Sequence, residues 1–379
     1  MIIQSTQVYF EEKLQPKQVR IENDTITGIF PYGLFKVDKD YKDNIIMPGL
    51  VDVHNHGYNK NECNRATNKW LDEWTHYLPE EGVTSTLATI SSHPKDELLK
   101  SLKVIGNYID KKNKKGTHIL GVYEEGPFIC STKERGAQSL ECQIIPTKKV
   151  IDEFNDACNG HLIYVMMAPE MLKGKYDVID YCVSKGMRVS IGHTAASFDV
   201  CMEAIKHGAT SFTHTYNGMR GLHHREPGVV GAAMYSDCYA EMIGDGIHVN
   251  KISQNILAKT KGKDKLMLIT DSGGIKGLKP GVHNYGAGSI TITEDGVGYL
   301  TGTNTLMGSC HKISRMLNYI IKEAHIDLVT ALNAATINPM RMLGITDRGL
   351  IKEGYKADIA VFNNNFEAQT VYIDGKLFK

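Results

Sequence analysis

The histidines and acidic residues of this sequence have the types and spacing that metal chemistry requires. His54 and His56 follow the apolar run 49–53. Residues two apart in extended backbone point to the same face, so both imidazoles can reach one ion. Four further ionisable residues each follow a short apolar run: Glu125, His193, His214 and Asp271. Imidazole and carboxylate ligands around an open position suit zinc or a similar divalent ion.

The chemistry that such a site supports is hydrolysis at a carbonyl-like carbon. A bound divalent ion lowers the pKa of a water to about 7 and polarises a carbonyl group. We expect Asp271 to act as the general base and then to return the proton to a leaving nitrogen. Zinc is the first expectation, and iron, manganese and cobalt fit the same ligands. One or two ions for each chain remain possible.

Each of these residues also has an ordinary structural explanation. A single histidine at a strand end is more often a hydrogen-bonded structural residue than a ligand. Asp271 could cap a helix, and Glu125 could pair with an arginine. The joint pattern favours the site, because six suitable side chains fall at equivalent positions.

The elements that would position these residues alternate between short apolar runs and longer amphipathic stretches. The expected strands are Leu50–Val53, Ser85–Ile90, His118–Tyr123, His161–Met167, Arg188–Ile191, Thr210–Phe212, Ala240–Ile243 and Lys265–Ile269. Helix-like segments separate most of them, for example Trp70–Glu81, Lys95–Tyr108, Asp177–Lys185 and Phe198–His207. This order predicts an α/β protein with a (β/α)8 TIM-like barrel, with an open doubly wound sheet as the alternative. All six residues follow expected strands, which is where barrels assemble active sites.

Both ends of the chain look β-rich. Residues 18–30 alternate polar and apolar side chains around Asn23-Asp24, and the stretches 357–362 and 370–378 resemble strands, the second with a turn at Asp374-Gly375. Neither end could form a core alone. We therefore predict a small β-sandwich domain formed by both termini, residues 1–47 and 345–379, around a barrel over residues 48–344. Tyr285–Leu300 is expected to be a β insertion after the last barrel strand.

Composition narrows the class of protein. Hydrophobic residues are 42% and charged residues 23% of the 379 residues, which is typical of a globular chain. Lys+Arg and Asp+Glu both number 43, so the net charge gives no reason to expect nucleic-acid or membrane partners. No apolar run approaches the ~18 residues of a spanning helix. The first ten residues do not resemble a secretory signal, and the eight cysteines form no CxxC pair, so we expect a cytoplasmic protein.

The site residues and their surroundings resemble the amidohydrolase superfamily, and within it the N-acetylglucosamine-6-phosphate deacetylases. The motifs that carry the resemblance are Glu124-Glu-Gly-Pro-Phe-Ile129, Gly192-His-Thr194, Thr213-His-Thr-Tyr-Asn-Gly-Met219, Arg225-Glu-Pro-Gly228, Asp245-Gly-Ile-His-Val249, Thr270-Asp271 and Gly354-Tyr-Lys-Ala-Asp358. They occur in order over nearly the whole chain.

The resemblance implies a homodimer that hydrolyses the acetamide of a phosphorylated amino sugar. By position, Glu125, His193 and His214 resemble the main metal ligands, and Asp271 resembles the catalytic acid and base. Arg225 and His248 resemble substrate and phosphate contacts, and the resemblance implies that Arg225 reaches the partner subunit's site, where a planar guanidinium suits phosphate oxygens. The remaining substrate contacts implied are Ala137, Gln138, Asn217, Gly218, Asp245, Leu300, Thr301 and Gly302.

Two departures from the family pattern bear on the mechanism. Some members replace the first two histidines and use one metal, whereas this chain keeps His54 and His56. The family usually has a histidine where this chain has Gln138, and an amide cannot carry a proton. A deacetylase of a related amino-sugar phosphate, such as the galactosamine epimer, therefore remains an alternative. A cyclic-amide hydrolase would need a lysine at the end of the fourth strand, and Lys173 lies beyond it. A non-catalytic scaffold would be expected to have lost ligands or base.

Overall fold

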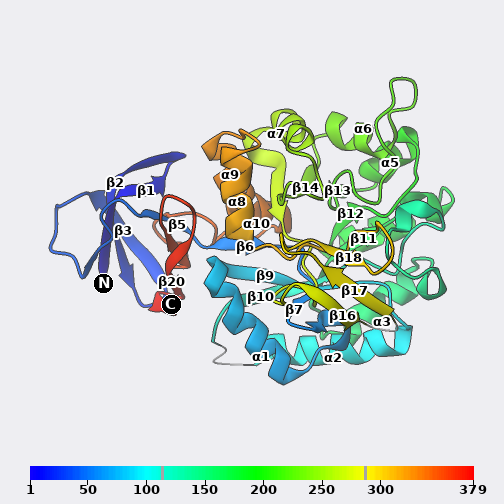
Figure 1. The fold of residues 1–379 in the computed structure, drawn as a ribbon, viewed down its shortest axis with the longest axis horizontal. Helices are drawn as coiled ribbons and strands as arrows, with labels where there is room; N and C mark the ends of the chain where they lie inside the picture. Colours follow the sequence, from blue (N-terminus) through cyan, green and yellow to red (C-terminus); the bar gives the residue numbers. More distant parts are fainter. Residues whose placement is uncertain (112–114, 286–287) are drawn as a thin grey trace.

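A parallel eight-stranded sheet forms the centre of the molecule. The computed structural model describes residues 1–111, 115–285 and 288–379. The sheet runs in the order β15-β14-β13-β12-β11-β10-β9-β6 (Figure 1). Its strands are β6 (Leu50–Asp52), β9 (Val83–Ile90), β10 (His118–Glu124), β11 (Leu162–Met167), β12 (Arg188–Ile191), β13 (Ala209–Phe212), β14 (Tyr239–Ile243) and β15 (Leu266–Ile269). Each begins and ends within two residues of an expected strand.

The sheet closes on itself beyond the ends of β6 and β15. Asn55 and Ser272 form a parallel bridge, and the Asp271 amide donates to the His54 carbonyl at 2.9 Å. The fold is therefore the expected TIM-like barrel, and closure itself places His54 next to Asp271. The open doubly wound alternative is wrong.

Helices cover the outside of this barrel. They are α1 (Asn68–Tyr77), α2 (Lys95–Asp110), α3 (Lys148–Ala157), α4 (Asp177–Ser184), α5 (Phe198–Lys206), α6 (Gly228–Tyr235), α7 (Lys251–Lys265), α8 (Ile313–Lys322), α9 (Leu328–Ala334) and α10 (Ile337–Leu343). The single helix expected over 70–81 is instead α1 followed by a 3-10 turn, Leu78–Glu81, because Pro79 has no amide hydrogen for an α-helical bond.

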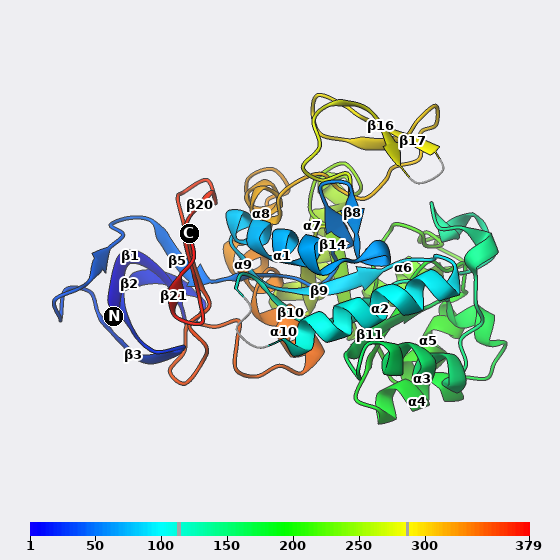
Figure 2. The ribbon, with the colours of Figure 1, turned by 90° about the horizontal axis from the view of Figure 1, so that it is seen from below.

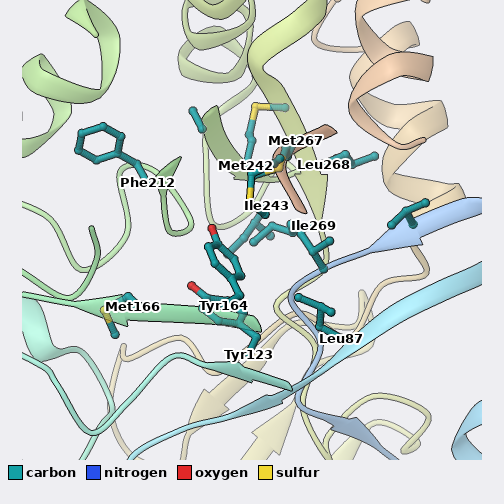
Figure 3. Close-up of a cluster of buried hydrophobic side chains, with 14 of the residues drawn as sticks. Leu87, Tyr123, Tyr164, Met166, Phe212, Met242, Ile243, Met267, Leu268 and Ile269 are labelled. Carbon is teal, nitrogen blue, oxygen red and sulfur yellow. The ribbon is translucent and has the colours of Figure 1, made fainter. Parts of the chain in front are cut away.

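The barrel interior is partly polar beneath the functional end. Tyr123 and Tyr164 are both fully buried and stack with ring centroids 4.0 Å apart (Figure 3). Their hydroxyls bond Thr213 at 2.7 Å and Ser211 at 2.8 Å. Buried hydroxyls are retained in such an interior only when each finds a partner, as these do.

Both ends of the chain build a second sheet beside the barrel (Figure 1). Its path is β21-β20-β19-β5-β1-β2-β3, and β4 also pairs with β1. The strands are β1 (Ile2–Phe10), β2 (Lys13–Glu22), β3 (Thr25–Pro31), β4 (Lys39–Asp40), β5 (Ile45–Pro48), β19 (Ile359–Phe362), β20 (Ala368–Ile373) and β21 (Lys376–Leu377). A bridge joins Thr25, at the start of β3, to Lys356, just before β19, and the sheet encloses a separate apolar core.

A three-stranded insertion follows β15. It comprises β16 (Gly281–Tyr285), β17 (Gly288–Ile292) and β18 (Gly298–Leu300), and it projects from the barrel (Figure 2). Residues 286 and 287 of the expected insertion lie outside the described residues. Among the residues that the structure describes, no helix is both long and apolar enough to cross a membrane.

Candidate metal centre and active site

The six expected residues converge at the carboxyl end of the barrel strands. His193, His214 and Asp271 each come two residues after a strand ends and have positive φ angles of 44°, 30° and 49°. Non-glycine residues adopt this left-handed conformation at a cost of about 1–3 kcal/mol, and such residues cluster at functional sites. At these residues the chain turns away from the direction of the preceding barrel strand.

One group of ligand atoms centres on a single carboxylate oxygen. Glu125 Oε1 lies 2.9 Å from His193 Nε2 and 3.0 Å from His214 Nε2. The two imidazole nitrogens are themselves 3.1 Å apart. All three residues are buried, with exposures of 7% or less.

A second group shares Glu125 with the first. His56 Nε2 lies 3.5 Å from Glu125 Oε2, so the two carboxylate oxygens face different histidines. Asp271 Oδ1 lies 3.3 Å from both His54 Nε2 and His56 Nε2. The ligand atoms of this group lie within 4.8 Å of one another, as do those of the first. The arrangement offers two adjacent cation positions.

The hydrogen bonds behind the imidazole rings test whether a cation fits. His54 Nδ1 donates to Glu241, His56 Nδ1 to the Thr89 carbonyl and His193 Nδ1 to the Glu134 carbonyl. In a neutral imidazole with Nδ1 protonated, Nε2 carries a lone pair. The Nε2 atoms of His54 and His56 are 3.2 Å apart, and two lone pairs facing each other repel. A divalent cation removes that repulsion, so the residues fit the metal.

The charges of the site favour ionised carboxylates. Burial alone would raise the pKa of Glu125, but His193 and His214 hold it well below its usual value. Burial would also raise the pKa of Asp271, and His54 and His56 again lower it well below normal. Both carboxylates are therefore charged at neutral pH and can bind a cation or accept a proton.

The Gln138 side chain hydrogen-bonds the candidate metal ligand Glu125. Its amide Nε2 donates to Glu125 Oε2 at 2.9 Å, and its Oε1 accepts from the Ser92 backbone amide at 2.9 Å. The substrate contact expected of Gln138 therefore competes with its bond to the carboxylate. Its position holds Glu125 Oε2 toward His56.

A cavity of about 430 Å³ opens over the ligand atoms. Of the expected substrate contacts, five line it: Ala137, Gln138, Asn217, Gly218 and His248. Gly218 has a φ of 57°, and a side chain there would come within 2.8 Å of His193 Nδ1. A cavity of similar size between the small sheet and α10 has no histidine in its lining.

Five other expected contacts do not line this cavity. Asp245 lies behind it and holds His248, with Oδ2 2.7 Å from the ring Nδ1, and Arg225 is exposed on the loop before α6. Leu300 is the last residue of β18, Thr301 and Gly302 follow it, and all three are exposed. The segment that reaches the cavity is 305–308, a few residues later, because the chain turns back at 301–304.

The loop 305–308 packs directly on Asp271. A side chain at Gly308 would lie 2.1 Å from the Asp271 carbonyl oxygen, so only glycine permits this approach. The Ser309 amide donates to the same carbonyl at 3.1 Å. His248 Nε2 bonds the Met307 carbonyl at 3.0 Å. The His248 pKa is raised because Asp245 outweighs the effect of burial, whereas the His248 ring lowers the pKa of Asp245 to about 2.

Sequence reasoning missed several residues of the site. Glu241 lies inside β14 and contacts His54, and Ser92 contacts Gln138. Glu241 could have been found from the sequence, because a charged residue is unusual within a buried parallel strand. Ser92 and the loop 305–308 carry no comparable signal.

Comparisons with known proteins agree with this geometry. Residues 45–378 match the model of the Amidohydrolase family. The chain is 32% identical over 329 residues to the N-acetylglucosamine-6-phosphate deacetylase of Bacillus subtilis (strain 168), covering 86% of this chain and 82% of the relative. It is 28% identical to the N-acetylgalactosamine-6-phosphate deacetylase of Escherichia coli O157:H7, covering 96% and 95%.

A solved structure matches the whole chain. It is an aspartate-to-alanine variant of the N-acetyl-D-glucosamine-6-phosphate deacetylase from Mycobacterium smegmatis, in complex with N-acetyl-D-glucosamine-6-phosphate. The TM-score is 0.93 at 26% identity, with 100% of this chain and 99% of the other covered.

Proposed function

The chain belongs to the amidohydrolase family, and we propose that it removes the acetyl group from N-acetyl-D-glucosamine 6-phosphate in amino-sugar catabolism. The observation that carries this proposal is the pair of ligand groups that share Glu125 within a cavity of about 430 Å³. Relatives that match most or all of the chain are N-acetylglucosamine-6-phosphate deacetylases. The products are D-glucosamine 6-phosphate and acetate.

The proposed ligands are Glu125, His193 and His214 at one position and His54 and His56 at the other, with Glu125 shared. A divalent ion, zinc first, would supply polarisation of the acetamide carbonyl and acidify a water. The imidazole and carboxylate donors fit zinc, iron, manganese and cobalt alike, so the donor set supports a divalent ion in general.

Asp271 moves the proton in this mechanism. Water attacks the acetamide carbon, and Asp271 accepts the proton that the water loses. The carbon–nitrogen bond then breaks, and Asp271 returns that proton to the departing nitrogen, which leaves as the amine. The lowered pKa of Asp271 keeps it unprotonated before attack. Asn217 and Gly218 line the cavity where the sugar would lie.

A phosphate dianion needs positive charge, and among the described residues that line this cavity only histidines can carry one. Among the described residues, no lysine or arginine lines that cavity. A phosphate dianion binds most readily to arginine, whose planar guanidinium matches its oxygens. We therefore propose a homodimer in which Arg225, exposed on the loop before α6, reaches the partner subunit's site. The cytoplasm is the proposed compartment, and it suits the eight cysteines, which are all free.

An assay over a panel of N-acetylated amino-sugar phosphates tests the proposal. The glucosamine and galactosamine epimers, each with and without phosphate, would be compared while bound metal is quantified in the same preparation. We expect the highest kcat/KM for N-acetylglucosamine 6-phosphate. The similarity to a galactosamine-epimer deacetylase makes that sugar the second candidate. Purified protein without tightly bound divalent ions, or with no activity on any member, would overturn the proposal.

A further inference from the structure

A fully buried carboxylate lies beneath the proposed metal centre, on the side away from the cavity. Glu241, on β14, has no exposed surface. Its Oε2 accepts from His54 Nδ1 at 2.9 Å and from the His214 backbone amide at 3.0 Å. Its Oε1 accepts from the Tyr164 hydroxyl at 2.9 Å. Three donors therefore hold this side chain in one orientation.

The hydrogen bond between Glu241 and His54 determines which nitrogen of the His54 ring carries the hydrogen and which faces His56 and Asp271. Because a carboxylate can only accept, His54 Nδ1 must carry the hydrogen. Its Nε2 then carries the lone pair and points toward His56 and Asp271, at 3.2 Å and 3.3 Å. A carboxylate behind a ligating imidazole also raises its basicity, which strengthens its bond to a metal.

The side chains of the other ligand group, Glu125, His193 and His214, form no hydrogen bond with Glu241. His193 Nδ1 donates to the Glu134 backbone carbonyl at 3.0 Å, and Glu125 Oε2 is held by Gln138. Glu241 touches His214 only through its backbone amide. The two cation positions therefore have different supports.

We propose that Glu241 is a positioning residue that orients His54 as a ligand of the His54/His56 position. The inference rests on the proposed metal-dependent function. Tyr164 supports Glu241, since its hydroxyl is the donor to the carboxylate oxygen that does not bond His54. Loss of Glu241 empties the His54/His56 position first and leaves the ion of Glu125, His193 and His214 in place.

Glu241→Gln is the informative substitution. If the amide oxygen takes the place of Oε2, both hydrogen bonds to it remain and only the negative charge is lost. If the amide nitrogen takes that place, it donates to His54 Nδ1, which moves the ring hydrogen to Nε2 and blocks the metal bond. It then also faces the His214 backbone N–H, another donor, so this orientation is the less favourable one. Both orientations weaken the same ion, and substitutions of this kind lower metal affinity by about 10–100-fold.

The measurement is metal content of the purified, metal-loaded protein after equilibration in a series of zinc buffers. We expect two ions for each wild-type chain, released in separate steps. In Glu241→Gln the affinity of the weaker ion falls about 10–100-fold and that of the tighter ion is unchanged. With manganese in place of zinc, the spin-coupled electron paramagnetic resonance signal of a neighbouring pair is replaced by that of single ions.

Two tyrosine variants provide a matched control. Tyr164→Phe and Tyr123→Phe each remove a hydroxyl from a fully buried, stacked ring, but only Tyr164 contacts Glu241. Tyr164→Phe is expected to weaken the second ion several-fold, and Tyr123→Phe to leave both ions as in wild type.

Several results would overturn the inference. They are a single ion in saturated wild-type protein, unchanged affinities in Glu241→Gln, or equal weakening of both ions. Activity separates this inference from the proposed function. A wild-type chain that holds two ions and loses one in Glu241→Gln, yet deacetylates none of the panel, would contradict the function alone.

Discussion

At the scale of single residues, the contacts of Gln138 bear on which group of the site can polarise the acetyl carbonyl. The Gln138 amide donates to Glu125 and accepts from Ser92. An amide so engaged positions a carboxylate and cannot transfer a proton. In the proposed mechanism a bound cation would polarise the acetyl carbonyl, and His54 and His56 would contribute by holding that cation.

Replacing Gln138 by leucine tests this role. Glu125 Oε2 would lose its donor, and the carboxylate would turn more freely between the two ligand groups. We expect kcat on the phosphorylated sugar to fall at least tenfold while KM changes little. A large rise in KM with unchanged kcat would instead assign Gln138 to substrate binding.

Asp271→Asn tests the base. The amide keeps the size of the side chain but cannot accept the proton of the attacking water, so we expect turnover to fall by about 10²–10⁴-fold. Metal bound by Glu125, His193 and His214 should remain. Metal analysis and single-turnover rates on the same preparation check both statements. Near-normal turnover would remove Asp271 from this role.

At the scale of elements, the ends of the barrel strands bring the site residues together. Behind them lies a buried carboxylate without a hydrogen-bond partner among the described residues. Glu124 is the last residue of β10, one position before the ligand Glu125, and it points to the opposite face. It is fully buried, and neither carboxylate oxygen has a hydrogen-bond partner among the described residues. Burial raises its pKa well above the usual 4.5.

Glu124→Met is therefore expected to stabilise the fold by about 1 kcal/mol, because an unsatisfied buried group costs roughly 1–3 kcal/mol. The folded pKa exceeds the unfolded one, so the carboxyl destabilises the protein increasingly as pH rises above 4.5. Urea midpoints of the metal-loaded protein at several pH values should show a gain that grows with pH.

Glu81→Met is the matched control. Glu81 is equally buried but pairs with the buried Lys276 at 2.7 Å. Removing one partner leaves an uncompensated charge, and we expect a loss of about 3–5 kcal/mol. A loss of stability in Glu124→Met as well would mean that its carboxyl has a favourable role.

The sequence predicted the barrel well because short runs rich in apolar residues, such as β11 and β15, alternate with helix-like segments. The positions of the six site residues followed, since side chains after such strands meet at one end of a barrel. The remaining contacts depend on how loops fold in three dimensions. Ser92 and the segment 305–308 meet the site through turns that have no periodic pattern, and the expected contact at 300–302 lies a few residues too early for this reason.

At the scale of the whole molecule, we propose that a second copy of the chain contributes the arginine that binds the phosphate. Arg225 is exposed and lies outside the cavity of its own chain, whose described lining has no lysine or arginine. The division into residues 1–47, 48–344 and 345–379 stays a prediction. It is supported by the separate apolar core of the small sheet.

Mixed dimers test whether Arg225 acts across subunits. Arg225→Ala alone should raise KM for the phosphorylated sugar at least tenfold with little change in kcat. Co-expression of Arg225→Ala with Asp271→Asn should produce heterodimers with one intact site, built from Asp271 of one chain and Arg225 of the other. Their KM should return to the wild-type value. If Arg225 acts within its own chain, or the protein is monomeric in ultracentrifugation, no such recovery occurs.

The sheet that joins both ends of the chain has a consequence for biosynthesis. β5 pairs with β19, which the ribosome makes only after the entire barrel. Until then the nascent chain carries β5 with one edge open, and an unpaired edge invites pairing with other chains. The barrel can fold first, and the sheet beside it closes last.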